Sequence, residues 1–139
     1  MINEWIFKLS EKVNENVTIK GDDKSRLIIV CKKAAYNDLT APMLTAMIKA
    51  IHFDTERDYR LIKSDGNIDL ASLVDSPFQY LLVFGFAPEQ IGFQISTHLY
   101  QPLKFDQMTA VFSDGLDVLV NDKLKKAKLW STLQSVFLK

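Results

Sequence analysis

The side chains that most often carry catalysis or bind metals are scarce in this sequence. The chain has two histidines, His52 and His98, and one cysteine, Cys31. No histidine, cysteine or carboxylate cluster has metal-ligand spacing, so we expect no metal site and no cofactor. Cys31 lies within an apolar run, where a thiol is typically buried and inert, and no serine lies in a Gly-x-Ser-x-Gly motif. We therefore expect no nucleophilic triad.

The loop after Cys31 also disfavours a phosphate site. It runs from Lys32 to Asp38, reads KKAAYND and contains no glycine. Glycine-rich turns bind phosphates because their backbone N–H groups can approach the ligand closely, so a dinucleotide or P-loop site is not expected here. Gly85 stands alone between an apolar run and a helix start, and we interpret it as structural.

Lysines are the remaining polar feature. Lys32 and Lys33 follow the same apolar run, and residues 123–139 contain five lysines and no acid. The lysines could simply be the solvated face of a helix, or they could form a local patch for an anionic partner, either nucleic acid or protein. The candidate binding residues are Lys32, Lys33, Tyr36, Lys123, Lys125 and Lys126.

The periodicity of apolar residues predicts the elements that position these side chains. We expect helices over 2–14, 43–51 and 68–74, helix starts at 88 and 116, and a last helix through 129–137. We expect strands over 17–20, 27–31, 59–63, 80–84, 99–105 and 108–112. Asp38 or Thr40 is the expected cap of the second helix.

Strands alternate with helices, and the runs 27–31 and 80–84 are apolar at almost every position. Unbroken apolar strands are typical of a parallel sheet that is covered on both faces. We therefore predict the α/β class, as a three-layer α/β/α sandwich with a mostly parallel central sheet.

Length and charge bound the function. The chain has 139 residues, of which 47% are hydrophobic, and its formal net charge is zero. This length suits one domain over residues 1–139. A neutral chain is not drawn as a whole to nucleic acid or anionic lipid, so nucleic-acid binding would be local and weak. Without a membrane-length apolar run or a signal peptide, we expect a cytoplasmic protein with no membrane partner.

The order of the expected elements resembles the uracil-DNA glycosylase superfamily over residues 26–138. Residues 27–31 resemble its first strand, and residues 39–53 resemble the helix of its first crossover. Residues 80–92 are similar to its third strand with the following glycine and helix. Residues 109–137 resemble its last strand and closing helix. The resemblance implies a glycosylase-like core over residues 26–138, and the N-terminal helix predicted from periodicity, within residues 1–16, precedes this core.

The catalytic motifs of that superfamily are not matched. Where it has a Gly-Pro-rich turn with a residue that handles the attacking water, this chain has Asn37 and Asp38 without glycine or proline. Where it has a His-Pro-Ser motif, this chain has Ser113 and Asp114, followed by Gly115. A carboxylate there would disfavour the anion of a leaving base. The cysteines of the iron–sulfur branch are missing too. We therefore expect no enzymatic activity.

The psi subunits of bacterial DNA polymerase III form a catalytically silent family of this shape. Residues 127–130, AKLW, are similar to a segment of their closing helix. This resemblance implies a non-enzymatic protein-interaction subunit, an accessory of DNA replication or repair, with a replisome or clamp-loader component as partner. Two alternatives stay open. One is a divergent nucleobase or DNA glycosylase-type hydrolase that uses Asn37 or Asp38 for water and Lys32 or Lys33 for phosphate. The other is a plain nucleic-acid-binding domain.

The apolar stripe of the predicted N-terminal helix, which includes Trp5, Ile6 and Leu9, also has two interpretations. It could pack on its own sheet, which we favour, or bind a partner.

Overall fold

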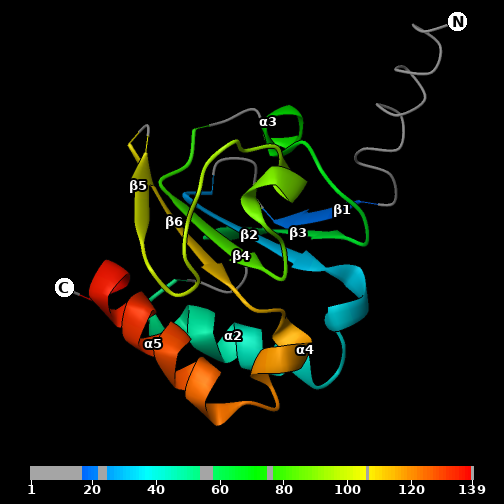
Figure 1. Ribbon diagram of the computed structural model, residues 1–139. Helices are drawn as coiled ribbons and strands as arrows, with labels where there is room; N and C mark the ends of the chain where they lie inside the picture. The colour runs from blue at the N-terminus through cyan, green and yellow to red at the C-terminus, as the bar shows by residue number, and fades with distance from the viewer. Residues whose placement is uncertain (1–16, 22–24, 54–57, 75–76, 106, 139) are drawn as a thin grey trace, which may run out of the picture.

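The computed structural model describes residues 17–21, 25–53, 58–74, 77–105 and 107–138 (Figure 1). A six-stranded sheet in the order β1-β3-β2-β4-β6-β5 forms its centre. The strands are β1 (Thr18–Gly21), β2 (Leu27–Lys32), β3 (Tyr59–Ser64), β4 (Tyr80–Phe84), β5 (Leu103–Phe105) and β6 (Met108–Ser113). The helices are α2 (Thr40–Ala50), α3 (Leu70–Leu73), α4 (Leu116–Leu119) and α5 (Lys123–Phe137), with 3-10 turns η1 (Lys33–Ala35) and η2 (Pro88–Ile91).

The sheet is parallel in its middle and antiparallel at its edges. β2 pairs in parallel with β3 and β4, and β4 pairs in parallel with β6. β1 and β5 add antiparallel edges. Only two residues separate β5 from β6, too few for the crossover that a parallel neighbour needs. The predicted α/β class is confirmed, and the sheet is mixed rather than purely parallel.

The two faces of the sheet are buried in two separate clusters. Alternate residues of β2 face opposite ways, so Leu27, Ile29 and Cys31 join one cluster while Ile28 and Val30 join the other. All five are at most 1% exposed, which explains why the run 27–31 of this strand is apolar at every position.

Helices cover the two faces unequally. α2, α4 and α5 cover the face of Leu27 and Ile29, whereas α3, η2 and coil cover the other (Figure 1). The segment predicted to be helical from residue 88 stops after one 3-10 turn, because Gly92 adopts a left-handed φ of 95° and ends it. Within the described residues, the second face therefore has no helix longer than α3, and the predicted three-layer sandwich is not confirmed.

Most predicted strands and helices lie where the periodicity placed them. β4 matches its predicted range, and β2, β3 and β6 differ from theirs by one residue at one end. α3 and β5 are shorter than predicted. The predicted helix over 2–14 lies outside the described residues. Among the described helices, none combines the length and apolar character needed to cross a bilayer.

Candidate functional site

The carboxyl ends of the parallel strands β2, β4 and β6 lie together at one end of the sheet, where an α/β fold would place a ligand. We call this end of the sheet the carboxyl edge. The chain leaves β2 towards β3 on one side, and it leaves β4 towards β6 and β5 on the other side. Ligands bind at such a switch point. The structure brings three of the sequence-derived positions together here. A Cβ added to Gly85 would lie 3.8 Å from Cγ of Lys32 and 3.2 Å from Cα of Gly115, which follows Asp114.

Gly85 allows two backbone segments to approach each other at this edge. Its φ is 83°, a left-handed value that other residues adopt at a cost, and its N–H donates to the Ser113 carbonyl over 2.9 Å. Any side chain at position 85 would press on the Gly115 backbone. The interpretation of Gly85 as structural is confirmed.

Asp114 is bonded to two side chains that the sequence did not connect with it. The Tyr100 hydroxyl donates to its Oδ2, and Lys125 Nζ lies 3.5 Å from the same oxygen. We call these three residues the Tyr100 cluster. Burial, followed by this hydrogen bond, raises the pKa of Tyr100 to about 12, so the hydroxyl keeps its proton at neutral pH. The Asp114 carboxylate is 24% exposed and is turned inward to this donor.

Tyr100 also ties its loop to the neighbouring elements. Its N–H donates to the Phe112 carbonyl of β6 over 2.9 Å, and its carbonyl accepts a hydrogen bond from the Thr132 hydroxyl of α5. These bonds hold Tyr100 at φ 65°, an uncommon value for an aromatic residue. Because its partners lie 12 to 32 positions away along the chain, no local sequence pattern could have indicated this residue.

Asn37 caps α2. Its side-chain oxygen accepts the N–H groups of Leu39 and Thr40 over 2.8 and 3.0 Å, and the Thr40 hydroxyl accepts the Asn37 N–H over 2.9 Å. This reciprocal pair satisfies backbone donors at the helix start. Of the two predicted caps, Thr40 takes part through its hydroxyl, while Asp38 does not and Asn37 stands in its place. Asp38 is exposed instead, and it lines a shallow depression with Thr45 and Lys49.

Two of the remaining candidates beside β2, Lys32 and Tyr36, make cation–π contacts with other side chains. Lys32 Nζ lies 5.0 Å from the centre of the Phe86 ring, and Lys63 Nζ lies 4.5 Å from that of Tyr36. Burial raises the pKa of Tyr36. Lys33 is in η1, where the Ala34 N–H donates to Asp65 Oδ1 over 3.2 Å. These contacts are made within the protein itself.

The prediction that the Cys31 thiol is buried is confirmed. Cys31 is fully buried, and burial raises the pKa of its thiol to about 12, with Lys63 acting in the opposite direction. Such a thiol is a poor nucleophile. Among the described residues, no three histidine, cysteine or acidic side chains are grouped so that they could hold a metal ion.

The lysines of α5 point in different directions. Lys125 contacts Asp114, whereas Lys126 lines an open groove of about 390 Å³ between α2 and α5. We call it the α2–α5 groove; its lining consists of Met43, Ala46, Met47, Ala50, Lys126 and Trp130. The helical periodicity placed Met43 and Met47 in the core stripe, but the structure leaves both half-buried beside it. Sequence reasoning therefore missed this groove.

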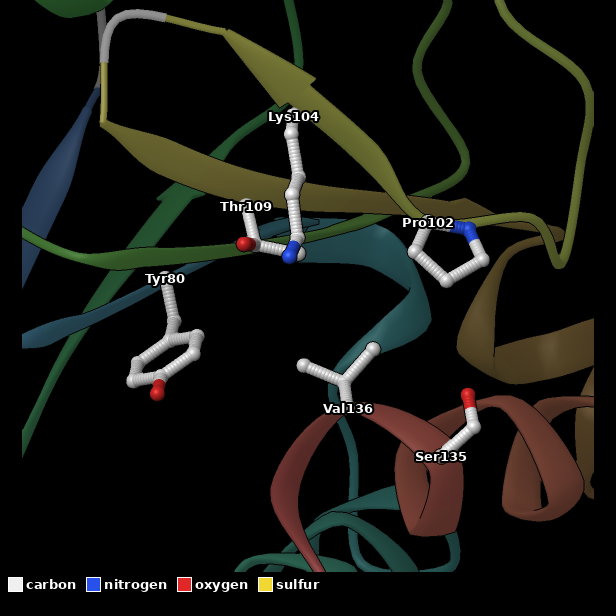
Figure 2. A pocket seen from close by; sticks show the side chains of 6 residues that line it. All are labelled: Tyr80, Pro102, Lys104, Thr109, Ser135 and Val136. Atoms are coloured by element: carbon white, nitrogen blue, oxygen red, sulfur yellow. The ribbon is translucent and has the colours of Figure 1, made fainter. Parts of the chain in front are cut away.

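A smaller cavity of about 240 Å³ lies at the other end of the sheet, next to the end of α5 (Figure 2). Tyr80, Lys104 and Thr109 come from the strands, and Ser135 and Val136 face them from α5. The Tyr80 ring packs against Phe137, with ring centres 4.6 Å apart. This cavity is formed at the first residue of β4 and is thus remote from the carboxyl edge.

Comparison of the chain with protein-family models, curated proteins and solved structures finds no match.

Proposed function

We propose that this protein is a non-enzymatic interaction subunit that binds a protein partner. The observation that carries the proposal is the Tyr100 cluster. It occupies the position where the glycosylase resemblance would place a catalytic imidazole, and it holds a carboxylate there between Tyr100 and Lys125. Hydrolysis of a glycosidic bond needs a group that stabilises the departing base as an anion. A carboxylate would repel that anion.

Asn37, which the resemblance places at the second catalytic position, also has a structural role. A hydrolase could use Asn37 or Asp38 to position water. Asp38 is exposed, whereas the side-chain oxygen of Asn37 already accepts two backbone N–H groups at the start of α2. Freeing that oxygen would leave helix donors unsatisfied, at a cost of about 1 kcal/mol. Both features support a domain that keeps its shape without the chemistry.

The pathway is part of the same proposal. The four parallel strands lie in the order β3-β2-β4-β6, with helices along the crossovers, and this arrangement supports a glycosylase-like fold. In such a sandwich, α3, η2 and the coil over 93–102 would be the third layer. With the segment 127–130 in α5, we assign the protein to DNA replication or repair in the cytoplasm, with a replisome component such as the clamp loader as its partner.

Two measurements on the full chain test the proposal. A tagged protein should capture a replication or repair protein from native lysate of its source cells. It should release no base from single- or double-stranded DNA that contains uracil or hypoxanthine. Capture of nothing above background would count against the partner. Base release that Asp38→Ala abolishes would overturn the non-enzymatic assignment in favour of the hydrolase.

A further inference from the structure

The α2–α5 groove has an apolar floor made by two helices. In α2, Leu44 and Ile48 point to the sheet and are buried, so Met43 and Met47 lie on the flank of the helix. In α5, Leu129 and Leu133 are buried, and Trp130 lies on the flank that meets α2. Both helices lie on the same side of the sheet (Figure 1). Among the described residues the groove is therefore open to solvent, while the apolar side chains of its floor pack against the core.

Lys126 is the charged residue in the lining of the groove, and the two helices that form the groove are basic. α2 and α5 together contain no aspartate or glutamate and carry Lys49, Lys123, Lys125, Lys126 and Lys128. Lys123, Lys126 and Trp130 follow the i, i+3, i+7 spacing and so share one flank of α5. Lys125 is drawn away to Asp114. The nearest preceding acid, Asp122, caps α5 by accepting the Lys125 N–H over 3.1 Å.

We propose that the α2–α5 groove is the docking site for an amphipathic helix of the partner protein. The apolar stripe of that helix would lie on Met43, Met47 and Trp130, and its carboxylates would lie beside Lys123 and Lys126. Grooves of this kind take helices through apolar anchors at i, i+3 and i+4. Methionines adapt to varied side chains, and tryptophan is a frequent interface anchor. The inference rests on the proposed function and specifies its surface.

Charge complementarity decides in favour of an acidic helix. Lys126 in the lining, with Lys123 on the same flank of α5, attracts carboxylates and repels a basic helix, which sets specificity and the rate of association. Nucleic acid and anionic lipid are also negative, but the apolar side chains here line a depression. A phosphate backbone would leave that floor uncovered, and insertion into a membrane needs side chains that protrude.

The test is selection from a displayed library of helical peptides, about three to four turns long, with leucines at helical spacing and random residues on the flanks. The bait is the full chain with Trp5→Phe, so that tryptophan fluorescence reports on Trp130. Selected peptides should be enriched in aspartate and glutamate over lysine and should change the Trp130 emission.

Two matched pairs of variants locate the binding. Lys126→Glu reverses a groove charge, and Lys128→Glu makes the same change on another flank of α5. We expect the Kd of selected peptides to rise about tenfold or more for Lys126→Glu and less than about twofold for Lys128→Glu. Ala50→Asp in the groove should weaken binding, while Thr45→Asp on the opposite flank of α2 should not. Circular dichroism verifies that each variant is folded.

Several outcomes would overturn the inference. One is a selection without enrichment or without acidic preference, and another is binding that Lys126→Glu and Ala50→Asp leave unchanged. Tighter binding of a single-stranded DNA oligonucleotide or of phosphatidylserine vesicles, weakened equally by both lysine variants, would replace the helix by those ligands. If a partner captured from lysate binds the Lys126→Glu variant normally, the groove fails while the proposed function stands. Base release from DNA would overturn the proposed function, and the peptide measurements would still decide on the groove.

Discussion

The carboxyl edge of the sheet and the α2–α5 groove differ in how their polar and apolar groups are satisfied. At the edge, Asp114 bonds to Tyr100 and Lys125, and Gly85 packs against the Gly115 backbone. In the groove, Met43, Met47 and Trp130 are half-buried and Lys126 forms the rim. At the carboxyl edge the side chains bond to each other, whereas in the groove part of each apolar side chain remains exposed to solvent.

This difference teaches that the architecture alone does not determine where a ligand binds. The switch point beside β2 is where α/β proteins commonly bind ligands, but here its side chains serve as internal ties. The groove is not a conventional site of the fold, yet its exposed apolar floor retains the capacity to gain free energy on burial. Variants in the two regions can test whether the side chains of the carboxyl edge stabilise the fold while those of the groove contribute little to stability.

The largest effect is expected for Gly85→Ala. A Cβ there would lie 3.2 Å from the Gly115 Cα, and the residue would have to keep a φ of 83°. Backbone strain and close contact should lower the free energy of unfolding by about 2–4 kcal/mol. Urea denaturation measures it. Gly66→Ala is the control, because a Cβ at Gly66 meets nothing within 4 Å, and it should change stability by less than about 0.5 kcal/mol. Equal losses of stability in the two variants would contradict close backbone packing at the carboxyl edge.

A smaller loss is expected for Tyr100→Phe, which removes the hydroxyl that donates to Asp114. We expect a loss of about 1 kcal/mol at neutral pH, because Lys125 still accompanies the carboxylate. Urea denaturation compares the two proteins, and Thr97→Val, in the same loop, serves as a control for the loss of a hydroxyl.

The pH dependence of the stability difference between the unchanged protein and Tyr100→Phe identifies the Tyr100 hydroxyl as its source. The pKa of Tyr100 is raised from 10 to about 12 in the folded protein, so the folded state keeps a proton that the unfolded chain loses above pH 10. The stabilisation is fully present below pH 10 and is lost as the pH rises towards 12. Cys31, Tyr36 and Tyr59 have raised pKa values in both proteins and cancel in the difference. An advantage of Tyr100 over Phe that is unchanged from pH 8 to 11.5 would exclude this hydrogen bond as its source.

Met47→Ala should have a still smaller effect on stability, about 0.5–1 kcal/mol, because the side chain is only partly buried in the folded monomer. Thr45→Ala on the other flank of α2 is the control. Thermal unfolding measures both. A loss as large as the 2–5 kcal/mol that is usual for a fully buried methionine would mean that the groove is part of the core rather than an open surface.

The sequence predicted the sheet better than the site. Val30 and Leu82 belong to runs whose apolar character has a local cause, burial on both faces, so their strands could be located from the pattern alone. η2 is shorter than expected because Gly92 ends it, and the absence of an apolar period after Phe93 was the available signal. The second face consequently has thinner cover than a symmetric sandwich.

The Tyr100 cluster could not be predicted because its members come from a loop, the end of β6 and the first turn of α5. Asp114 was singled out for its charge, but its partners depend on how those segments meet in space. The role of Asn37, in contrast, has a local cause. An asparagine followed three residues later by a threonine fits a reciprocal helix cap, and these two residues form one. The lysines of α5 are close together in the sequence, but the helix distributes Lys125 and Lys126 over different flanks.

The last comparison is between Lys125 and Lys128, and its effect is the smallest. Lys125 Nζ lies 3.5 Å from Asp114, but the lysine side chain is 41% exposed, so solvent screens the pair and we expect a coupling free energy of at most about 0.5 kcal/mol. A double-mutant cycle with Lys125→Gln and Asp114→Asn, measured by urea denaturation at low and high salt, gives this coupling. It should decrease with salt, whereas a cycle with Lys128→Gln should give none. A coupling above about 1.5 kcal/mol that salt leaves unchanged would show that Lys125 is a desolvated partner of Asp114. The carboxylate would then be largely neutralised, and the electrostatic argument against an anionic leaving group at this edge would have to be given up.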